Sequence, residues 1–193
     1  MIRVIDDFAN AEYYKVIESG VLTNFVWSWA SDISGGSLNL FGFSHKLFDA
    51  GKPASRFYEF LLPLFLQAQG ETDAEILLRA RGDMTVNFGE QITYEPHIDM
   101  PWHKEHINMI FYIGDSDGDT IIYEEKYLWQ EPSIKPDLPK TLTEEQRVSP
   151  KANRLVIFSG EHWHTGQSPK NHSRRVILNL NFAKDDYRMT LND

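Results

Sequence analysis

The sequence of 193 residues contains no cysteine. Disulfides, thiolate metal sites, iron–sulfur clusters and cysteine nucleophiles are therefore all excluded. Any metal ion would have to be bound by histidine and carboxylate side chains, a ligand set that suits iron, manganese or zinc.

The sequence also has no apolar run of about 18 residues, so we expect no membrane-spanning helix and no membrane contact. Its beginning, MIRVIDDFAN, carries neither an apolar signal core nor a basic lead, which predicts a cytoplasmic protein. No stripe of Lys and Arg is present, and the net charge is −9. Because clustered cations bind phosphate backbones, this balance argues against nucleic acid as the main partner.

Aromatic residues make up 13% of the chain and apolar residues 41%, enough for one packed domain. The spacing of apolar residues predicts two helices, at 10–22 with Asn10 as N-cap and at 54–69 with a kink or break at Pro63. Residues 23–51 favour no particular element. Strands are predicted at 2–8, 76–88, 106–113, 119–125, 153–159 and 174–182.

Helices followed by a run of strands predict an α+β domain whose β part is a sandwich or jelly roll. We expect a single domain over 1–193, with helical support over about 1–75 and a jelly-roll core over about 76–183. Residues 126–152 hold four prolines and many charges. They indicate an excursion from the sheet that forms a flap over the site.

Residues 97–106, HIDMPWHKEH, bring three histidines and two acids into ten positions. Such a cluster is either a polar surface loop or part of a metal site. On an extended chain His97 and Asp99 point to the same side, so both can reach one ion. A His-x-Asp pair alone arises easily by chance.

A facial iron site needs two histidines and one carboxylate, with positions left open for substrates. The second histidine has two candidates, His162 and His164, in FSGEHWHTGQSP at 158–169. Both follow a predicted strand and precede turn residues, which is also the position of a solvated turn histidine.

The last predicted strand, RRVILNLNF, carries an arginine on each face. Arg174 heads the more apolar face, with Val176, Leu178, Leu180 and Phe182, and we expect that face to look inward. An inward guanidinium requires an anion and pairs bidentately with a carboxylate. Arg175 shares its face with Ile177, Asn179 and Asn181, which we expect to point outward.

Together these residues resemble the iron(II)- and 2-oxoglutarate-dependent oxygenases, and among them the prolyl 4-hydroxylase-like group. That pattern is His-x-Asp, a distal His, and an Arg or Lys roughly ten residues later. Here it is HID at 97–99, HTG at 164–166, and Arg174. The spacing favours His164 over His162 and Arg174 over Arg175. The resemblance extends from about Met84 to Phe182.

The resemblance implies a double-stranded β-helix core with N-terminal helices packed on it. It implies Fe²⁺ on His97, Asp99 and His164, with 2-oxoglutarate and O2 as cosubstrates and ascorbate as an optional reductant. The implied contacts to 2-oxoglutarate are Arg174, Tyr112, Asn108, Phe88 in place of the usual tyrosine, and Tyr94. His103 and His106 would decorate the loop or the next strand, and Glu105 would be solvated.

The activity implied is a dioxygenase that hydroxylates an unactivated C–H bond and releases succinate and CO2. Its substrate is a peptide or a small metabolite, and a prolyl residue in a peptide is the leading candidate by analogy. Trp102, Trp129 and Trp163 are candidates to stack on it. The alternative is a non-catalytic, cupin-like jelly roll that binds a metal or small molecule. A nucleic-acid dealkylase on the same fold is disfavoured by the net charge of −9.

Overall fold

The computed structural model describes residues 2–33, 40–103, 105–128 and 137–184. The helices are α1 (Ala11–Asn24) and α2 (Phe57–Gln69). The strands are β1 (Arg3–Ile5), β2 (Ser28–Ala30), β3 (Gly42–Asp49), β4 (Lys52–Pro53), β5 (Ile76–Val86), β6 (Ile107–Tyr112), β7 (Thr120–Lys126), β8 (Glu144–Val148), β9 (Leu155–Ser159), β10 (His162–Gly166) and β11 (Arg174–Ala183). No helix among these residues is long and apolar enough to cross a membrane.

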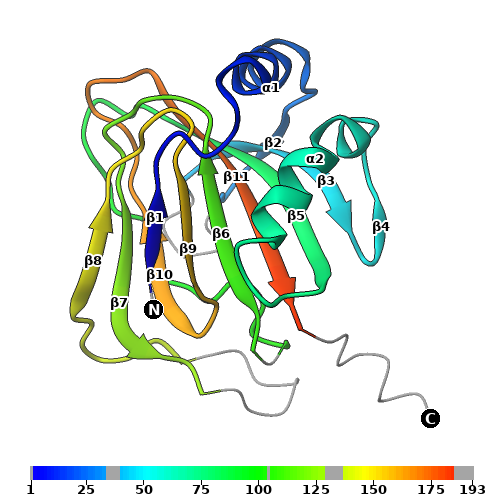
Figure 1. The fold of residues 1–193 in the computed structure, drawn as a ribbon. Helices are drawn as coiled ribbons and strands as arrows, with labels where there is room; N and C mark the ends of the chain where they lie inside the picture. The colour runs from blue at the N-terminus through cyan, green and yellow to red at the C-terminus, as the bar shows by residue number, and fades with distance from the viewer. Residues whose placement is uncertain (1, 34–39, 104, 129–136, 185–193) are drawn as a thin grey trace.

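The strands form two antiparallel sheets (Figure 1). The larger sheet has the order β1-β9-β6-β11-β5-β3-β2, with β4 attached to β3. The smaller sheet has the order β10-β7-β8. The α+β jelly roll with N-terminal helices that we expected is confirmed.

Both helices pack on one face of the larger sheet (Figure 1). Their core residues include Ile17, Val21, Leu61, Leu64 and Phe65, all nearly inaccessible to solvent. Asn10 caps α1 as predicted, because its Oδ1 accepts a hydrogen bond from the backbone N–H of Glu12 at 3.0 Å. The second helix continues through Pro63 as one helix.

The middle strands of the larger sheet, β9, β6 and β11, are buried on both faces, and this corrects the expected orientation of β11. Val176, Leu178, Leu180 and Phe182 pack against the helices. Ile177, on the other face, belongs to a second apolar cluster between the two sheets. The more apolar face of β11 therefore points to the helices, and the face that carries Arg175 points between the sheets.

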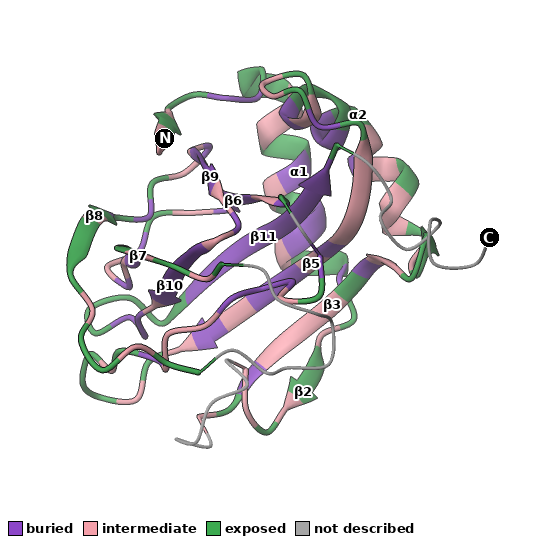
Figure 2. Ribbon diagram, turned by 90° about the horizontal axis from the view of Figure 1, so that it is seen from below, coloured by how far each residue is buried: buried purple, intermediate pink, exposed green. Residues whose placement is uncertain are grey.

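Two expectations about the borders of the core need correction. Residues 1–75 are not helical support alone, because β1 to β4 join the larger sheet and β2 and β3 come from the unassigned stretch 23–51. The expected excursion at 126–152 includes β8, which pairs with β7. Figure 2 shows β8 as mostly exposed, whereas β10 and β11 are buried. Residues 129–136 of the expected flap lie outside the described residues.

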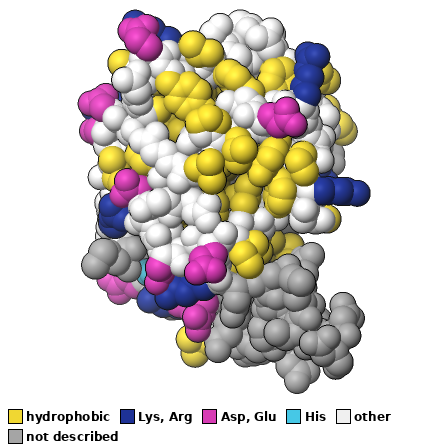
Figure 3. Space-filling model, turned by 45° about the vertical axis from the view of Figure 1, so that its right-hand side comes forward, with side chains coloured by type: hydrophobic (Ala, Val, Ile, Leu, Met, Phe, Trp, Pro, Cys, Tyr) yellow, Lys and Arg dark blue, Asp and Glu magenta, His cyan; other side chains and the backbone are white. Residues whose placement is uncertain are grey.

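The outer surface of the helical layer is not uniformly polar. Val16 of α1 and Leu66 of α2 are exposed. Seen from the side that bears α2 and β4, hydrophobic side chains gather over the upper part of the surface and charged ones lie at its margin (Figure 3).

Candidate metal centre and cosubstrate cavity

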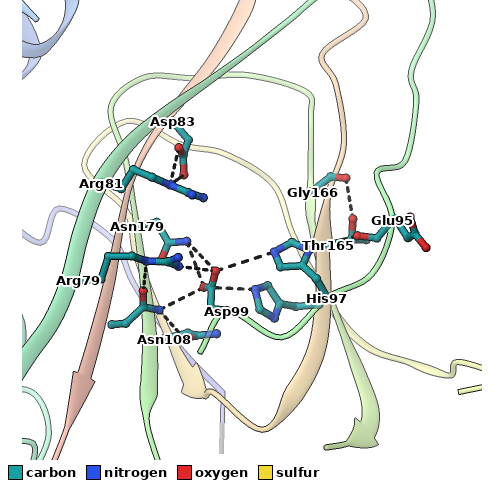
Figure 4. Close-up of polar contacts among 12 residues, drawn as sticks. Arg79, Arg81, Asp83, Glu95, His97, Asp99, Asn108, Thr165, Gly166 and Asn179 are labelled. Carbon is teal, nitrogen blue, oxygen red and sulfur yellow. Dashed lines mark hydrogen bonds and ion pairs between the residues drawn. The ribbon is translucent and has the colours of Figure 1, made fainter. Parts of the chain in front are cut away.

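His97, Asp99 and His164 come together between β10 of the smaller sheet and β11 of the larger one. Figure 4 shows His97 and Asp99 with their polar contacts. One potential ligand atom from each lies within 4.8 Å of the others. Two backbone hydrogen bonds hold the histidines together: His97 N–H donates to His164 O at 2.9 Å, and His164 N–H donates to His97 O at 3.2 Å. This pairing joins the segment after β5 to β10, so residues far apart in sequence share one site.

Both histidines present the Nε2 atom to the centre of the site. His97 Nδ1 lies 3.1 Å from the carbonyl of Glu95, and His164 Nδ1 lies 3.0 Å from the carbonyl of His162. A carbonyl can only accept, so each Nδ1 carries the proton and each Nε2 keeps a lone pair. Burial, together with the neighbouring His164, lowers the pKa of His97 to about 4, which keeps its imidazole neutral at pH 7.

The carboxylate of Asp99 is held from behind by three donors. Arg79 Nη2 donates to its Oδ1 at 2.7 Å, and Asn179 Nδ2 and Asn181 Nδ2 donate to its Oδ2 at 3.1 and 3.2 Å. Burial opposes ionisation, but the pKa of Asp99 still lies well below its usual range, and the charge of Arg79 is the largest lowering cause. The carboxylate is therefore charged and held in place. Carboxylates that bind metal ions are held by supporting hydrogen bonds in the same way.

The other histidines of the region are buried rather than exposed. His162 Nδ1 lies 2.8 Å from the carbonyl of Tyr123, and the ring is not part of the triad. His103 and His106, expected in the loop or the next strand, lie in the turn after Asp99 and directly before β6, and each is only 3% exposed. Burial lowers the pKa of His106 to about 4. Glu105 is exposed, as predicted.

A small cavity of about 60 Å³ adjoins the triad, and its lining includes His97, His164, Tyr94 and Arg175. Arg175 is only 5% exposed. Its Nη2 donates to Thr120 Oγ1 at 2.7 Å, while its buried Nε has no hydrogen-bond partner among the described residues. A buried cation with a free donor, facing a cavity, is a site for an anion.

Arg174 lies on the opposite face of β11. Its side chain is exposed and lines a separate hollow with Glu18 and Leu22 of α1. The prediction that Arg174 faces the site is therefore wrong. Because the helices cover the apolar face of β11, the inward arginine is Arg175.

Three other expected contacts are close to the site, in different ways. Tyr94 lines the small cavity, and burial raises the pKa of its phenol to about 12. The Tyr112 hydroxyl lies 2.6 Å from Thr120 Oγ1, and the Arg175 guanidinium stands over the Tyr112 ring at 5.6 Å. Asn108 is linked to Asp99 through Asn181, whose Nδ2 donates to Asn108 Oδ1 at 2.8 Å and also to Asp99 Oδ2.

Phe88 does not reach the cavity. It lies beyond the end of β5 and packs edge-to-face against Phe41, with ring centroids 5.2 Å apart. On the inward face of β5 the cavity is instead lined by Thr85, Asp83 and Arg81. The expected aromatic contact is wrong, because Phe88 follows the alternation of Ala80 and Met84, which pack on the helix side of β5, and not that of the cavity-lining residues.

Residues 84–183 match the family model described as the 2OG-Fe(II) oxygenase superfamily. The chain belongs to this superfamily. The match spans both halves of the triad and Arg175, and it agrees with the resemblance found in the sequence. The chain is thus a 2-oxoglutarate-dependent oxygenase, with Fe(II), 2-oxoglutarate and O2 as its reaction partners.

Solved structures share the fold of this oxygenase at low sequence identity. A 2OG-Fe(II) oxygenase family oxidoreductase from Burkholderia pseudomallei has a TM-score of 0.67 at 12% identity, covering 96% of this chain and 86% of its own. A Trichoplax adhaerens prolyl hydroxylase, solved with a hypoxia inducible factor peptide fragment, has 0.64 at 13% identity, covering 100% and 87%. The non-heme alpha ketoglutarate dependent epimerase SnoN of nogalamycin biosynthesis has 0.66 at 9% identity, covering 94% and 78%. No curated protein sequence matches the chain.

The supporting residues of this oxygenase site were missed in the sequence, although a signal for them was present. Arg79 and Arg81 alternate with apolar residues along β5, and Asn179 and Asn181 do so along β11. The two strands pair with Asn179 opposite Arg81 and Asn181 opposite Arg79. Polar residues on one face of two strands whose other face is apolar were the signal of a polar interior.

Proposed function

We propose that the chain hydroxylates an unactivated C–H bond, with Fe²⁺ held by His97, Asp99 and His164 and with the distal carboxylate of 2-oxoglutarate held by Arg175. The observation that carries the proposal is the triad next to a buried arginine with a free donor. A metal-binding jelly roll without catalysis needs no such arginine.

The donor set fits Fe²⁺. Two imidazole nitrogens with free lone pairs and one ionised carboxylate form the facial set typical of non-haem iron oxygenases. The closest approaches, 3.6 Å from His164 Nε2 to Asp99 Oδ2 and 4.0 Å from His97 Nε2 to Asp99 Oδ1, leave space for an ion between them. Once bound, iron and 2-oxoglutarate supply the oxidation of the substrate C–H bond, with succinate and CO2 as the other products.

The small cavity fits 2-oxoglutarate at its carboxylate end. Arg175 supplies charge and a free donor, and Thr120 supplies a hydroxyl on the same wall. Gly166 of β10 leaves room for the guanidinium, since a Cβ there would stand only 3.3 Å from Arg175 Nη1. Tyr94 closes the cavity with an aromatic wall.

The substrate is a peptide or a small metabolite. Hydroxylation of a prolyl residue has the support of the prolyl hydroxylase solved with a peptide fragment, while SnoN belongs to the biosynthesis of a small molecule. These similarities support the fold. The choice between the two substrate classes depends on the residues that line the site.

Anaerobic titration with Fe(II) and 2-oxoglutarate tests the proposal. We expect a visible metal-to-ligand charge-transfer band that requires both components, because 2-oxoglutarate chelates the metal only when open positions remain. Admission of O2 should then yield succinate. The cupin-like alternative predicts metal binding without this band, and that result would refute the proposed function.

A further inference from the structure

A second and larger cavity, of about 420 Å³, opens on the other side of Asp99. Its walls are residues 76–81 of β5, the adjoining part of β3 with the turn after it, and Met100, Trp102 and His103 of the turn after Asp99. Arg81 lines this cavity and also the small one beside His97 and His164, so the two cavities adjoin at Arg81. Its volume lies within the roughly 300–1,000 Å³ of small-molecule sites.

The lining of the larger cavity is basic, although the chain as a whole carries a net charge of −9. Three cations, Lys46, Arg79 and Arg81, line it against one acid, Asp49. Asp83, the partner of Arg81, lines the small cavity instead. A basic cavity in an acidic protein favours an anionic ligand.

Each of these cations already has an aspartate partner. Arg79 donates to Asp99 at 2.7 Å and, through Nε, to Asn181 Oδ1 at 2.8 Å. Lys46 lies 3.0 Å from Asp49 in an exposed ion pair. Exposed pairs of this kind contribute little free energy, so Lys46 can turn to a ligand at small cost.

Arg81 is the cation with a free binding edge. Its Nε lies 2.7 and 2.9 Å from the two oxygens of Asp83, which fixes the side chain. Its Nη1 and Nη2 make no hydrogen bond within the described part of the chain. Figure 4 shows the guanidinium extending from β5 toward the triad. Two such nitrogens in a rigid plane match the two oxygens of a carboxylate.

We propose that the larger cavity binds the hydroxylation substrate through a carboxylate held by Arg81, with Lys46 beside it, and that this substrate is a small carboxylic acid such as an amino acid. Trp102, 39% exposed, offers an aromatic surface for the apolar part of the molecule. The inference rests on the proposed function for the reaction, but the binding of the carboxylate needs only the side chains of the cavity.

Ligand-observed NMR can test this with zinc-loaded protein and 2-oxoglutarate, which binds without turnover. The probes are the twenty standard amino acids and their C-terminal amides, which keep the side chain but lose the carboxylate. We expect at least one amino acid to bind about ten- to a hundredfold more tightly than its amide, since a charged hydrogen bond is lost. Equal binding of every acid and amide pair would overturn the inference.

Variants locate the carboxylate. The double variant Arg81→Gln/Asp83→Asn removes both charges of the pair, so no buried carboxylate is left alone, and it should abolish the preference for acids. Lys46→Met should weaken acid binding by a smaller factor. Lys15→Met is the matched control, because Lys15 also forms an exposed i,i+3 ion pair, with Glu12 at 2.8 Å, but on α1. An unchanged preference in the double variant would place the ligand elsewhere and overturn the inference.

The two proposals fail in different ways. If the Fe(II)–2-oxoglutarate band is absent, the proposed function fails, and NMR on the metal-free protein still decides whether the cavity selects acids. If the band forms and acids and amides bind alike, this inference alone fails. Hydroxylation of an N- and C-terminally blocked prolyl peptide, at a rate that the double variant does not change, would also contradict it.

Discussion

Replacement of Arg175 tests the cosubstrate cavity most directly. Arg175→Met keeps a long unbranched side chain and removes the charge from a position only 5% exposed to solvent. A desolvated charge pair is worth about 2–5 kcal/mol. The apparent dissociation constant of 2-oxoglutarate should therefore rise by about two to three powers of ten.

Arg174 provides the matched control on the neighbouring position of the same strand. Its side chain is exposed and faces α1, so Arg174→Met should leave 2-oxoglutarate binding nearly unchanged. The assay is the anaerobic charge-transfer titration at fixed Fe(II), with thermal unfolding measured in parallel. Thermal unfolding is needed because Arg175 also donates to Thr120 at 2.7 Å.

A larger effect of Arg174→Met than of Arg175→Met would restore the assignment based on the ten-residue spacing. Equal, small effects in two folded variants would show that neither arginine binds the cosubstrate. Loss of iron affinity in Arg175→Met would instead point to collapse of the site.

Three further predictions concern the metal and the stability of the fold. His164→Ala should abolish iron-dependent succinate formation while His162→Ala retains much of it, since only His164 belongs to the triad; the reverse order would reject that ligand. Asp117→Ala should lower the free energy of unfolding by about 1–3 kcal/mol, because the carboxylate accepts from the backbone N–H of Asn171 at 2.7 Å. Burial raises the pKa of Asp117 but its hydrogen bonds lower it to about 2, so in urea titrations this difference should be full above about pH 4 and fade toward pH 2; a pH-independent difference would contradict it. Leu64→Ala should cost about 2–5 kcal/mol by the same measurement, and a loss below 1 kcal/mol would mean that the helical layer adds little.

Much of the fold followed from local patterns in the sequence. The alternation along 76–88 and 174–182 predicted β5 and β11, and Asn10 with the spacing after it predicted α1. The strands that were not predicted are β2, β3, β4, β8 and β10. Of these, β3 lies in an aromatic and glycine-rich stretch, and β8 in a proline-rich one. Their β structure depends on partners, since β3 pairs with β5 and β8 with β7. Such pairing is decided by tertiary context rather than by propensity.

The proposed iron ligands could be picked out from the sequence because their constraint is local. His97 and Asp99 are two positions apart on extended chain, and such spacing places two side chains on one side in any fold. The support around them is not local. Arg79 reaches Asp99 across twenty positions of sequence, and Asn179 and Asn181 reach it from β11, about eighty positions away.

The inward arginine shows where counting along the chain stops being reliable. Ten positions separate His164 from Arg174, but they span the end of β10 and the turn before β11, whose register no residue count fixes.

Alternation within β11 still divided its residues correctly into two faces. The assignment of the two faces was wrong, because the more apolar face was expected to line the site. In a sheet with helices on one side and a site on the other, both faces are buried, and the polar face lines the site because charged ligands require it. A strand with Arg, Asn and Asn on alternate positions, inside a sheet covered by helices, therefore indicates the site through its polar face, and Arg175 rather than Arg174 follows from that rule.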